Sequence, residues 1–412
     1  MLNSQVAPWP CFTQEEAAAV ERVLLSNRVN YWTGTEGRDF EKEFAAWVGA
    51  RYAVALANGT VALDLALKGL DIGPGDEVIV TPRTFLASVS CVVTAGATPV
   101  FADVDRDSGN LTAQTIAAVM TPKTKAVICV HLAGWPCDMD PIMALAEEHS
   151  FFVIEDCAQA HGARYKGRSV GSIGHVGAWS FCQDKIMTTG GEGGMVTTSD
   201  AELWSRMWSY KDHGKSWSAV YERQHPPGFR WLHESFGTNW RMTEMQSAIG
   251  RIQLKRMREW TRKRQVNAMA IMDVLQEFDG QGGVIRAPGQ RACDGCNRAG
   301  ECVIEADGSG CVHAQYKLYA YVQPHNLAQG WSRDRIVAEV CAEGVPCFQG
   351  GCSEVYLEKA FENTNWRPKS RLPVARELGE TSLMFLVHPT LTESDIQKTC
   401  AVLRKVLQWA EA

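Results

Sequence analysis

The amino-acid sequence predicts an α/β fold: a large domain with a mostly parallel sheet flanked by helices, followed by a smaller α+β carboxyl-terminal domain. Short apolar segments alternate with helical segments from about residue 52 to residue 154, and turn-forming residues such as those at 73–76 separate them. The apolar segments are rich in β-branched residues throughout, which is typical of parallel strands buried on both faces. Such an alternation favours a doubly wound sheet.

The apolar segments predict strands at residues 52–57, 77–80, 98–102, 126–130 and 151–154, and two more at 178–181 and 195–198. The segments between the first five predict helices at 60–70, 85–95, 112–120 and 141–149. Two helices are expected earlier in the chain. The first runs from Thr13 to Leu25 and opens with a capping box between Thr13 and Glu16, and the second covers residues 39–48. After Trp179 the helical pattern weakens, apart from a long helix at about 243–278 and a closing helix at 392–409.

These elements divide the 412 residues into an N-terminal arm and helix at 1–30, a large domain at 31–270 and a small domain at 271–412. Residues 280–310 are rich in Gly and Cys and are poor material for a core. The net charge of −6 argues against a nucleic-acid partner, because such proteins need a basic face. We also expect no membrane partner and a cytoplasmic location, since neither a signal-peptide pattern nor an apolar run of about 18 residues is visible.

Three features carry chemistry at the expected carboxyl ends of the strands. The sequence Asn58-Gly59-Thr60 opens a helix, where free backbone amides attract phosphate. Asp156 ends a strand, and Lys185 precedes a glycine-rich run. Each alone has an ordinary interpretation as a helix start, a turn cap or a surface lysine. Together they are the parts that pyridoxal phosphate (PLP) requires: a phosphate site, a partner for the ring nitrogen, and an amine for the Schiff base.

Several motifs occur in a characteristic order. They are Asn58-Gly59-Thr60, Glu155 to Gln159, Ser180 to Lys185, Gly191 to Gly194 and Gly237 to Met242. In this order the chain resembles the DegT/DnrJ/StrS family of sugar aminotransferases, which are PLP enzymes of fold type I. The resemblance extends from about Trp32 to Thr392, and it implies a large PLP-binding domain.

The resemblance implies how the cofactor is held. The amides of Gly59 and Thr60, with the Ser180 hydroxyl, would bind the phosphate. Phe85 would stack on the ring, a favourable aromatic contact. Asp156 would pair with the ring nitrogen.

Further roles follow from the same resemblance. Gln159 would lie near the phenolic oxygen of the ring. Lys185 would form the Schiff base and then move the proton between cofactor and substrate carbon. Asn239 would reach the phosphate bound by a neighbouring subunit, which implies a homodimer with shared sites. Three residues are expected either to contact substrate or to make structural hydrogen bonds: His131, Glu192 and His213.

The activity implied is transfer of an amino group, with glutamate as donor and the pyridoxamine form (PMP) as carrier, to a nucleotide-linked keto-sugar. The sugar expected is a UDP- or dTDP-linked 4-keto-6-deoxyhexose, and the product an amino sugar for polysaccharide or glycan synthesis. The alternatives are a keto-inositol or another carbocycle as acceptor, and a non-catalytic regulator that binds PLP or a sugar. The presence of both Lys185 and Asp156 argues against the regulator.

A cysteine-rich insertion at 291–313 departs from the family pattern. Its cysteines have spacing that could bind a structural zinc as thiolates, and the alternative is a loop with incidental thiols. The candidate ligands are Cys293, Cys296, Cys302 and Cys311.

Overall fold

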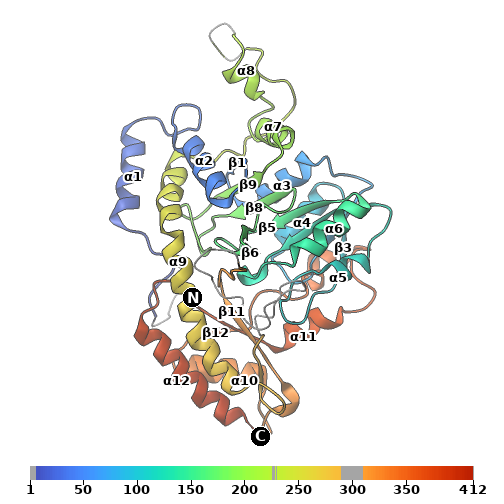
Figure 1. The fold of residues 1–412 in the computed structure, drawn as a ribbon, viewed down its shortest axis with the longest axis vertical. Coiled ribbons are helices and arrows are strands. Elements are labelled where there is room, and N and C mark those ends of the chain that lie inside the picture. The colour runs from blue at the N-terminus through green and yellow to red at the C-terminus, as the bar shows by residue number, and fades with distance from the viewer. Residues whose placement is uncertain (1–5, 225–227, 229, 289–309, 412) are drawn as a thin grey trace.

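The fold of the computed structural model, which describes residues 6–224, 228, 230–288 and 310–411, is built round a seven-stranded sheet (Figure 1). The strand order is β1-β9-β8-β5-β4-β2-β3. Strand β9 pairs antiparallel with β1 and β8, and all other neighbours pair in parallel. The mostly parallel sheet is therefore confirmed. Its strands are β1 (Tyr52–Leu56), β2 (Glu77–Val80), β3 (Thr98–Phe101), β4 (Thr124–Val130), β5 (Phe152–Asp156), β8 (Val176–Ser180) and β9 (Gly194–Thr198).

Helices cover both faces of this sheet, as predicted. Along β1, Val54 and Leu56 pack on one side and Ala53 and Ala55 on the other, because successive strand residues point to opposite faces. The first side packs against α3 (Gly59–Gly69), α4 (Ala87–Thr94) and α7 (Ala201–Tyr210). The second packs against α2 (Glu36–Val48), α5 (Ala113–Ala117) and α6 (Met139–His149).

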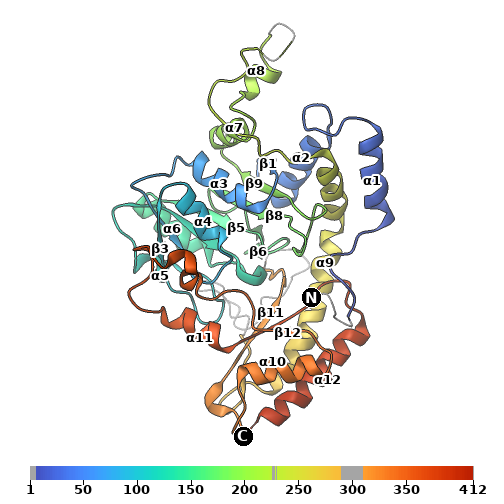
Figure 2. The same ribbon diagram turned by 180° about the vertical axis from the view of Figure 1, so that it is seen from behind.

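The long helix α9 (Glu244–Glu277) joins two hydrophobic cores. Thr243 begins it with a capping box to Gln246. Its first half packs against α1 (Gln14–Leu25) and α2, and its second half runs beside α12 (Glu393–Ala410) (Figures 1 and 2). Leu254 belongs to the core beneath the sheet, and Leu275 belongs to the second core. The predicted domain boundary near residue 270 falls within α9, so that boundary stays a prediction.

The second core has an antiparallel four-stranded sheet of order β10-β11-β13-β12, which confirms the smaller α+β unit. The expectation that 280–310 contributes no core was wrong at its start, because Val284, Ile285 and Ala287 are buried in this core. The weak helical pattern after Trp179 also missed four helices of the described chain: α7, α8, α10 and α11. The remaining elements are α8 (Trp217–Tyr221), α10 (Arg333–Ala342), α11 (Pro373–Thr381), β6 (Arg164–Tyr165), β7 (Arg168–Ser169), β10 (Ile285–Arg286), β11 (Leu318–Val322), β12 (Cys347–Phe348), β13 (Ser382–Phe385) and 3₁₀ turns at Leu132–Gly134, Pro324–Asn326, Val355–Leu357 and Lys359–Phe361.

Among the helices described, none combines the length and the apolar character needed to cross a bilayer.

Candidate active site

The carboxyl ends of the parallel strands border a cavity of about 1150 Å³. Open α/β sheets bind ligands at this edge. Every residue predicted to hold the cofactor lines the cavity except Asn239, and Glu192 lines it as well. These residues follow different strands, so the fold brings them together. They are Gly59, Thr60, Phe85, Asp156, Gln159, Ser180 and Lys185.

A tight backbone approach shapes the cavity where α3 begins. Gly59 is the first residue of α3, and a Cβ placed on it would lie 2.5 Å from the Cβ of Ser180, so no larger residue fits. The side chain of Asn58 accepts a 3.0 Å hydrogen bond from the amide of Val61 and caps the helix. The positive end of the helix dipole therefore faces the cavity beside the Ser180 hydroxyl, an arrangement that suits phosphate.

The carboxylate of Asp156 is held from two sides at the end of β5. Ser88 Oγ donates a 2.7 Å hydrogen bond to Oδ2, and the amide of Ala158 donates a 3.1 Å bond to Oδ1. The hydroxyl of Thr84 lies 2.7 Å from that of Ser88 and extends the network. Sequence reasoning missed Thr84 and Ser88, although their spacing of four near the start of a helix places them on one face. The network fixes the orientation of Asp156, which is 5% exposed.

Lys185 is half-buried beside Tyr316, which packs in the core beneath the main sheet. Its Nζ lies 5.3 Å from the centroid of the Tyr316 ring. The Tyr316 hydroxyl donates a 2.6 Å hydrogen bond to Asp184. Burial raises the pKa of Asp184, but the Lys185 ammonium and the Tyr316 hydrogen bond outweigh it and hold that pKa below its ordinary value. The lysine thus lies next to an ionised carboxylate.

The N-terminal segment supports the backbone of Lys185. The indole N–H of Trp9 donates a 2.8 Å hydrogen bond to the Lys185 carbonyl. The Trp9 ring meets that of Trp260 edge-on at 5.1 Å and stacks on His388 at 6.1 Å, and the guanidinium of Arg264 lies 5.0 Å from its centroid. These contacts fix the indole of Trp9. Through it, residues that are far away in the sequence hold the backbone of Lys185 in place.

His131 lies outside the cavity lining and is fully buried. Its Nε2 is 3.0 Å from Oε2 of Glu155, and its Nδ1 accepts a 3.0 Å hydrogen bond from the amide of Cys137. The Nε2 proton therefore points to Glu155. Burial raises the pKa of Glu155, but the His131 hydrogen bond and the amides of Gly171 and Gly174 together hold that pKa below its ordinary value. This arrangement favours the structural interpretation of His131.

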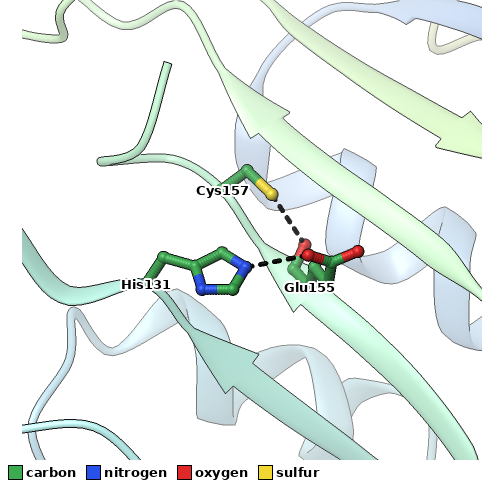
Figure 3. Close-up of side chains that lie close together, drawn as sticks. All are labelled: His131, Glu155 and Cys157. Carbon is green, nitrogen blue, oxygen red and sulfur yellow. Dashed lines mark hydrogen bonds and ion pairs between the residues drawn. The ribbon is translucent and has the colours of Figure 1, made fainter. Parts of the chain in front are cut away.

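Within the described residues, His131, Glu155 and Cys157 are the group whose ligand atoms lie close enough to suggest a metal (Figure 3). Their hydrogen bonds argue against one. Both oxygens of Glu155 accept N–H groups, and the thiol of Cys157 lies 3.6 Å from the Glu155 carbonyl oxygen. We interpret the group as a hydrogen-bonded support of the sheet edge.

The other predicted residues lie elsewhere. Asn239 and His213 are exposed and do not line the cavity. The Sγ of Cys311 accepts a 3.2 Å hydrogen bond from the amide of Lys166. The remaining candidate zinc ligands lie outside the described residues: Cys293, Cys296 and Cys302.

Comparison with known proteins agrees with this geometry. The family model of the DegT/DnrJ/EryC1/StrS aminotransferase family matches residues 10–404. This chain belongs to that family. The resemblance inferred from the motifs is therefore confirmed, and so are the aminotransferase class and fold type I.

Individual relatives of this DegT-family chain cover nearly its whole length. A solved structure of an aminotransferase from Psychrobacter cryohalolentis is 64% identical, with a TM-score of 0.92 over 98% of this chain and 99% of that one. The spore coat polysaccharide biosynthesis protein SpsC of Bacillus subtilis (strain 168) is 42% identical over 98% of this chain and 97% of its own. The UDP-N-acetyl-3-dehydro-alpha-D-glucosamine 3-aminotransferase of Acidithiobacillus ferrooxidans is 36% identical over 91% and 89%.

Members of this family depend on PLP, and the cavity of this DegT-family chain fits that cofactor. The bare backbone at Gly59 leaves helix amides for the phosphate. The Phe85 side chain lines the cavity yet is 73% exposed, so a ring face is available for stacking. Asp156 is oriented at the strand end for a cationic ring nitrogen. The residues present therefore match the phosphate, the ring and the nitrogen.

Replacing Trp9 with Phe in this DegT-family chain should loosen Lys185 while keeping the ring contacts. The variant loses one hydrogen bond, so we expect its turnover number to be roughly 3- to 10-fold lower than that of the wild type. Its melting temperature should change little. Steady-state kinetics and thermal melts of Trp9→Phe measure both. Trp409→Phe, at a half-exposed site on α12, is the control. Equal turnover in both variants would contradict the supporting role.

Replacing Glu155 with Gln should destabilise the fold. Both carboxylate oxygens of Glu155 accept N–H groups, and in the variant an NH₂ group would take the place of one oxygen and face those donors. We expect a loss of about 3 kcal/mol in the free energy of unfolding at pH 7. The folded pKa of Glu155 lies below the ordinary 4.5, so its ionised form stabilises the fold above that pH and the stabilisation fades as pH falls through the folded pKa.

Urea unfolding of Glu155→Gln at several pH values tests this. The difference from the wild type should be constant above about pH 5 and shrink in more acidic solution. Glu148→Gln, at an exposed position on α6, provides the matched control. A difference that does not change between pH 3 and pH 7 would contradict the argument.

Proposed function

We propose that this chain transfers an amino group from glutamate to a nucleotide-linked keto-sugar in the cytoplasm, and that the acceptor is a UDP- or dTDP-linked 4-keto-6-deoxyhexose. The observation that carries the proposal is that Lys185, Asp156 and the Gly59 cradle border one cavity. The product would be an amino sugar for polysaccharide or glycan synthesis.

The residues divide the chemistry among them. PLP, when bound, withdraws electrons from the carbon that gains or loses the amine. Lys185 would bond to the cofactor and, once released by substrate, carry a proton to or from that carbon. Asp156 would keep the ring nitrogen protonated. Gln159 uses its Oε1 to accept a 2.8 Å hydrogen bond from the amide of Ala133, which leaves its NH₂ group to donate to the phenolic oxygen.

The size of the cavity supports a large acceptor. Pockets for drug-sized ligands usually measure roughly 300–1000 Å³. About 1150 Å³ therefore leaves room for a sugar beside the cofactor. The names of several relatives support the substrate class, since they include a GDP-perosamine synthase and transaminases of UDP- and dTDP-linked sugars.

The exposed segment around Asn239 supports a homodimer. Trp231 and Phe236 on the same segment are 85% and 98% exposed, and large exposed aromatic side chains favour contact with a partner. We infer that a second copy covers them and that Asn239 of the partner subunit reaches the phosphate site. A zinc ion bound by Cys293, Cys296, Cys302 and Cys311 is a separate hypothesis, and metal analysis of the purified protein would test it.

The absorption spectrum of the purified protein with PLP tests the central assignment. We expect a visible band that glutamate bleaches, because the Lys185 link to the cofactor absorbs there. Lys185→Ala should lack the band. Lys317→Ala, which removes the other lysine of the cavity, should keep it. A band that persists in Lys185→Ala would sink the assignment.

Once the band is established, a panel of UDP-, dTDP- and GDP-linked keto-sugars and a keto-inositol would identify the acceptor. The acceptor is the compound that restores the band after glutamate has bleached it. If only the keto-inositol does so, the acceptor is a carbocycle and the sugar proposal is wrong. If no substrate acts on a protein that binds PLP, the chain is a non-catalytic binder.

Asp156→Asn should fold normally and turn over roughly 100-fold more slowly, since a neutral partner no longer keeps the ring nitrogen protonated. The turnover number with glutamate measures the loss. Asp140→Asn, on the surface of α6, is the control. Near-normal turnover would mean that another acid serves the ring.

A further inference from the structure

Arg83 is a buried cation on the cavity wall that the cofactor assignment does not use. It follows β2 and is 1% exposed. Its Nη1 donates a 2.8 Å hydrogen bond to the hydroxyl of Ser353. In the described chain, its Nε and Nη2 have no hydrogen-bond partner and no contact with solvent. Buried charges are normally paired, so a guanidinium left this way indicates an anion that arrives with a ligand.

The unpartnered nitrogens identify the kind of anion. The N–H groups of Nε and Nη2 lie parallel along one edge of a guanidinium, the edge that binds both oxygens of a carboxylate. Ser353 occupies the remaining nitrogen. The ring centroids of Tyr319 and Tyr321 lie 5.1 and 5.7 Å from the guanidinium carbon, so aromatic contacts restrain its plane.

A second cation, Lys317, borders the same cavity. Lys317 immediately precedes β11, in which Tyr319 is the second residue. Its ammonium makes no hydrogen bond to the residues described. Burial, opposed by the Asp184 carboxylate and reinforced by Arg264 and Lys185, lowers the pKa of Lys317 to about 8. A carboxylate nearby would stabilise its charged form.

We propose that Arg83 binds a carboxylate of the amine donor and that Lys317 adds positive charge to the same subsite. The inference rests on the proposed function. An amino-acid donor always carries a carboxylate, and in a closed site that group needs a cation. The cofactor phosphate is assigned to Gly59 and Ser180, and Lys185 is assigned to the reacting carbon. Arg83 therefore remains for the donor.

Arg83→Gln in the PLP-loaded protein tests the proposal. In this variant, bleaching of the visible band should need a glutamate concentration at least roughly 30-fold higher than in the wild type. That is the loss of affinity expected when a bidentate charge-assisted pair is removed. Calorimetry with glutarate, an unreactive dicarboxylate, should show a parallel loss of binding. Arg106→Gln, on the surface beside Glu377, should match the wild type in both measurements.

Separate half-reactions distinguish the donor from the acceptor. The pyridoxamine form of Arg83→Gln should react with the keto-sugar at the wild-type concentration dependence. A weakened acceptor reaction with normal glutamate saturation would assign Arg83 to an acidic group of the sugar and overturn the proposal. Normal behaviour in both half-reactions would also overturn it. If Arg83→Gln does not fold, Arg83→Lys tests the same point. It keeps the charge without the parallel N–H groups, so its loss of glutamate affinity should lie between those of the wild type and of a full loss of the pair.

Failure of this proposal can be distinguished from failure of the proposed function on which it rests. If the wild-type band and its bleaching by glutamate are absent, the proposed function fails before Arg83 is changed. If they are present, only the donor concentration dependence of the variants decides the role of Arg83.

Discussion

The buried carboxylate of Glu155 is the interaction on which the geometry of the active-site edge depends. Its two oxygens accept hydrogen bonds from His131 and from the amides of Gly171, Ile173 and Gly174. His131 follows β4, and the amides belong to the turn that leads into β8, so one side chain connects three neighbouring strands. Because successive strand residues face opposite sides, the same register that buries Glu155 turns Asp156 toward the other side.

The position of Lys185 depends on parts of the chain that lie far from it. Trp9 holds its carbonyl, and Tyr316, just before β11, holds Asp184 beside it. The rings around Trp9 come from α9 and from the segment before α12. The position of the lysine therefore depends on contacts with the N-terminal segment, with α9 and with the residues just before β11 and α12.

Sequence predicted the main sheet well because parallel strands buried on both faces leave a continuous apolar pattern, and Asp156 could be proposed as a site residue because it ends such a strand. The second core was harder, since strands as short as β10 and β12 are too brief to show a period. Ser88, Trp9 and Tyr316 were missed because their roles exist only through contacts with distant residues. For His131, the choice between a substrate contact and a structural hydrogen bond depends on Glu155. The sequence cannot show that this residue, 24 positions away, is its partner.

The distribution of charge round the cavity connects stability with the chemistry. The proposed phosphate cradle uses the helix terminus at Gly59 and the Ser180 hydroxyl, neither of which carries a full charge, so it needs no compensating charge when empty. Arg83 differs, because burying a cation without an anion destabilises a fold. Such groups persist where a ligand supplies the missing partner. With the donor carboxylate as that partner, its departure after the amine is transferred leaves Arg83 unpaired again. The emptied site then favours renewed binding of donor, and the acceptor must be bound by contacts that do not depend on Arg83.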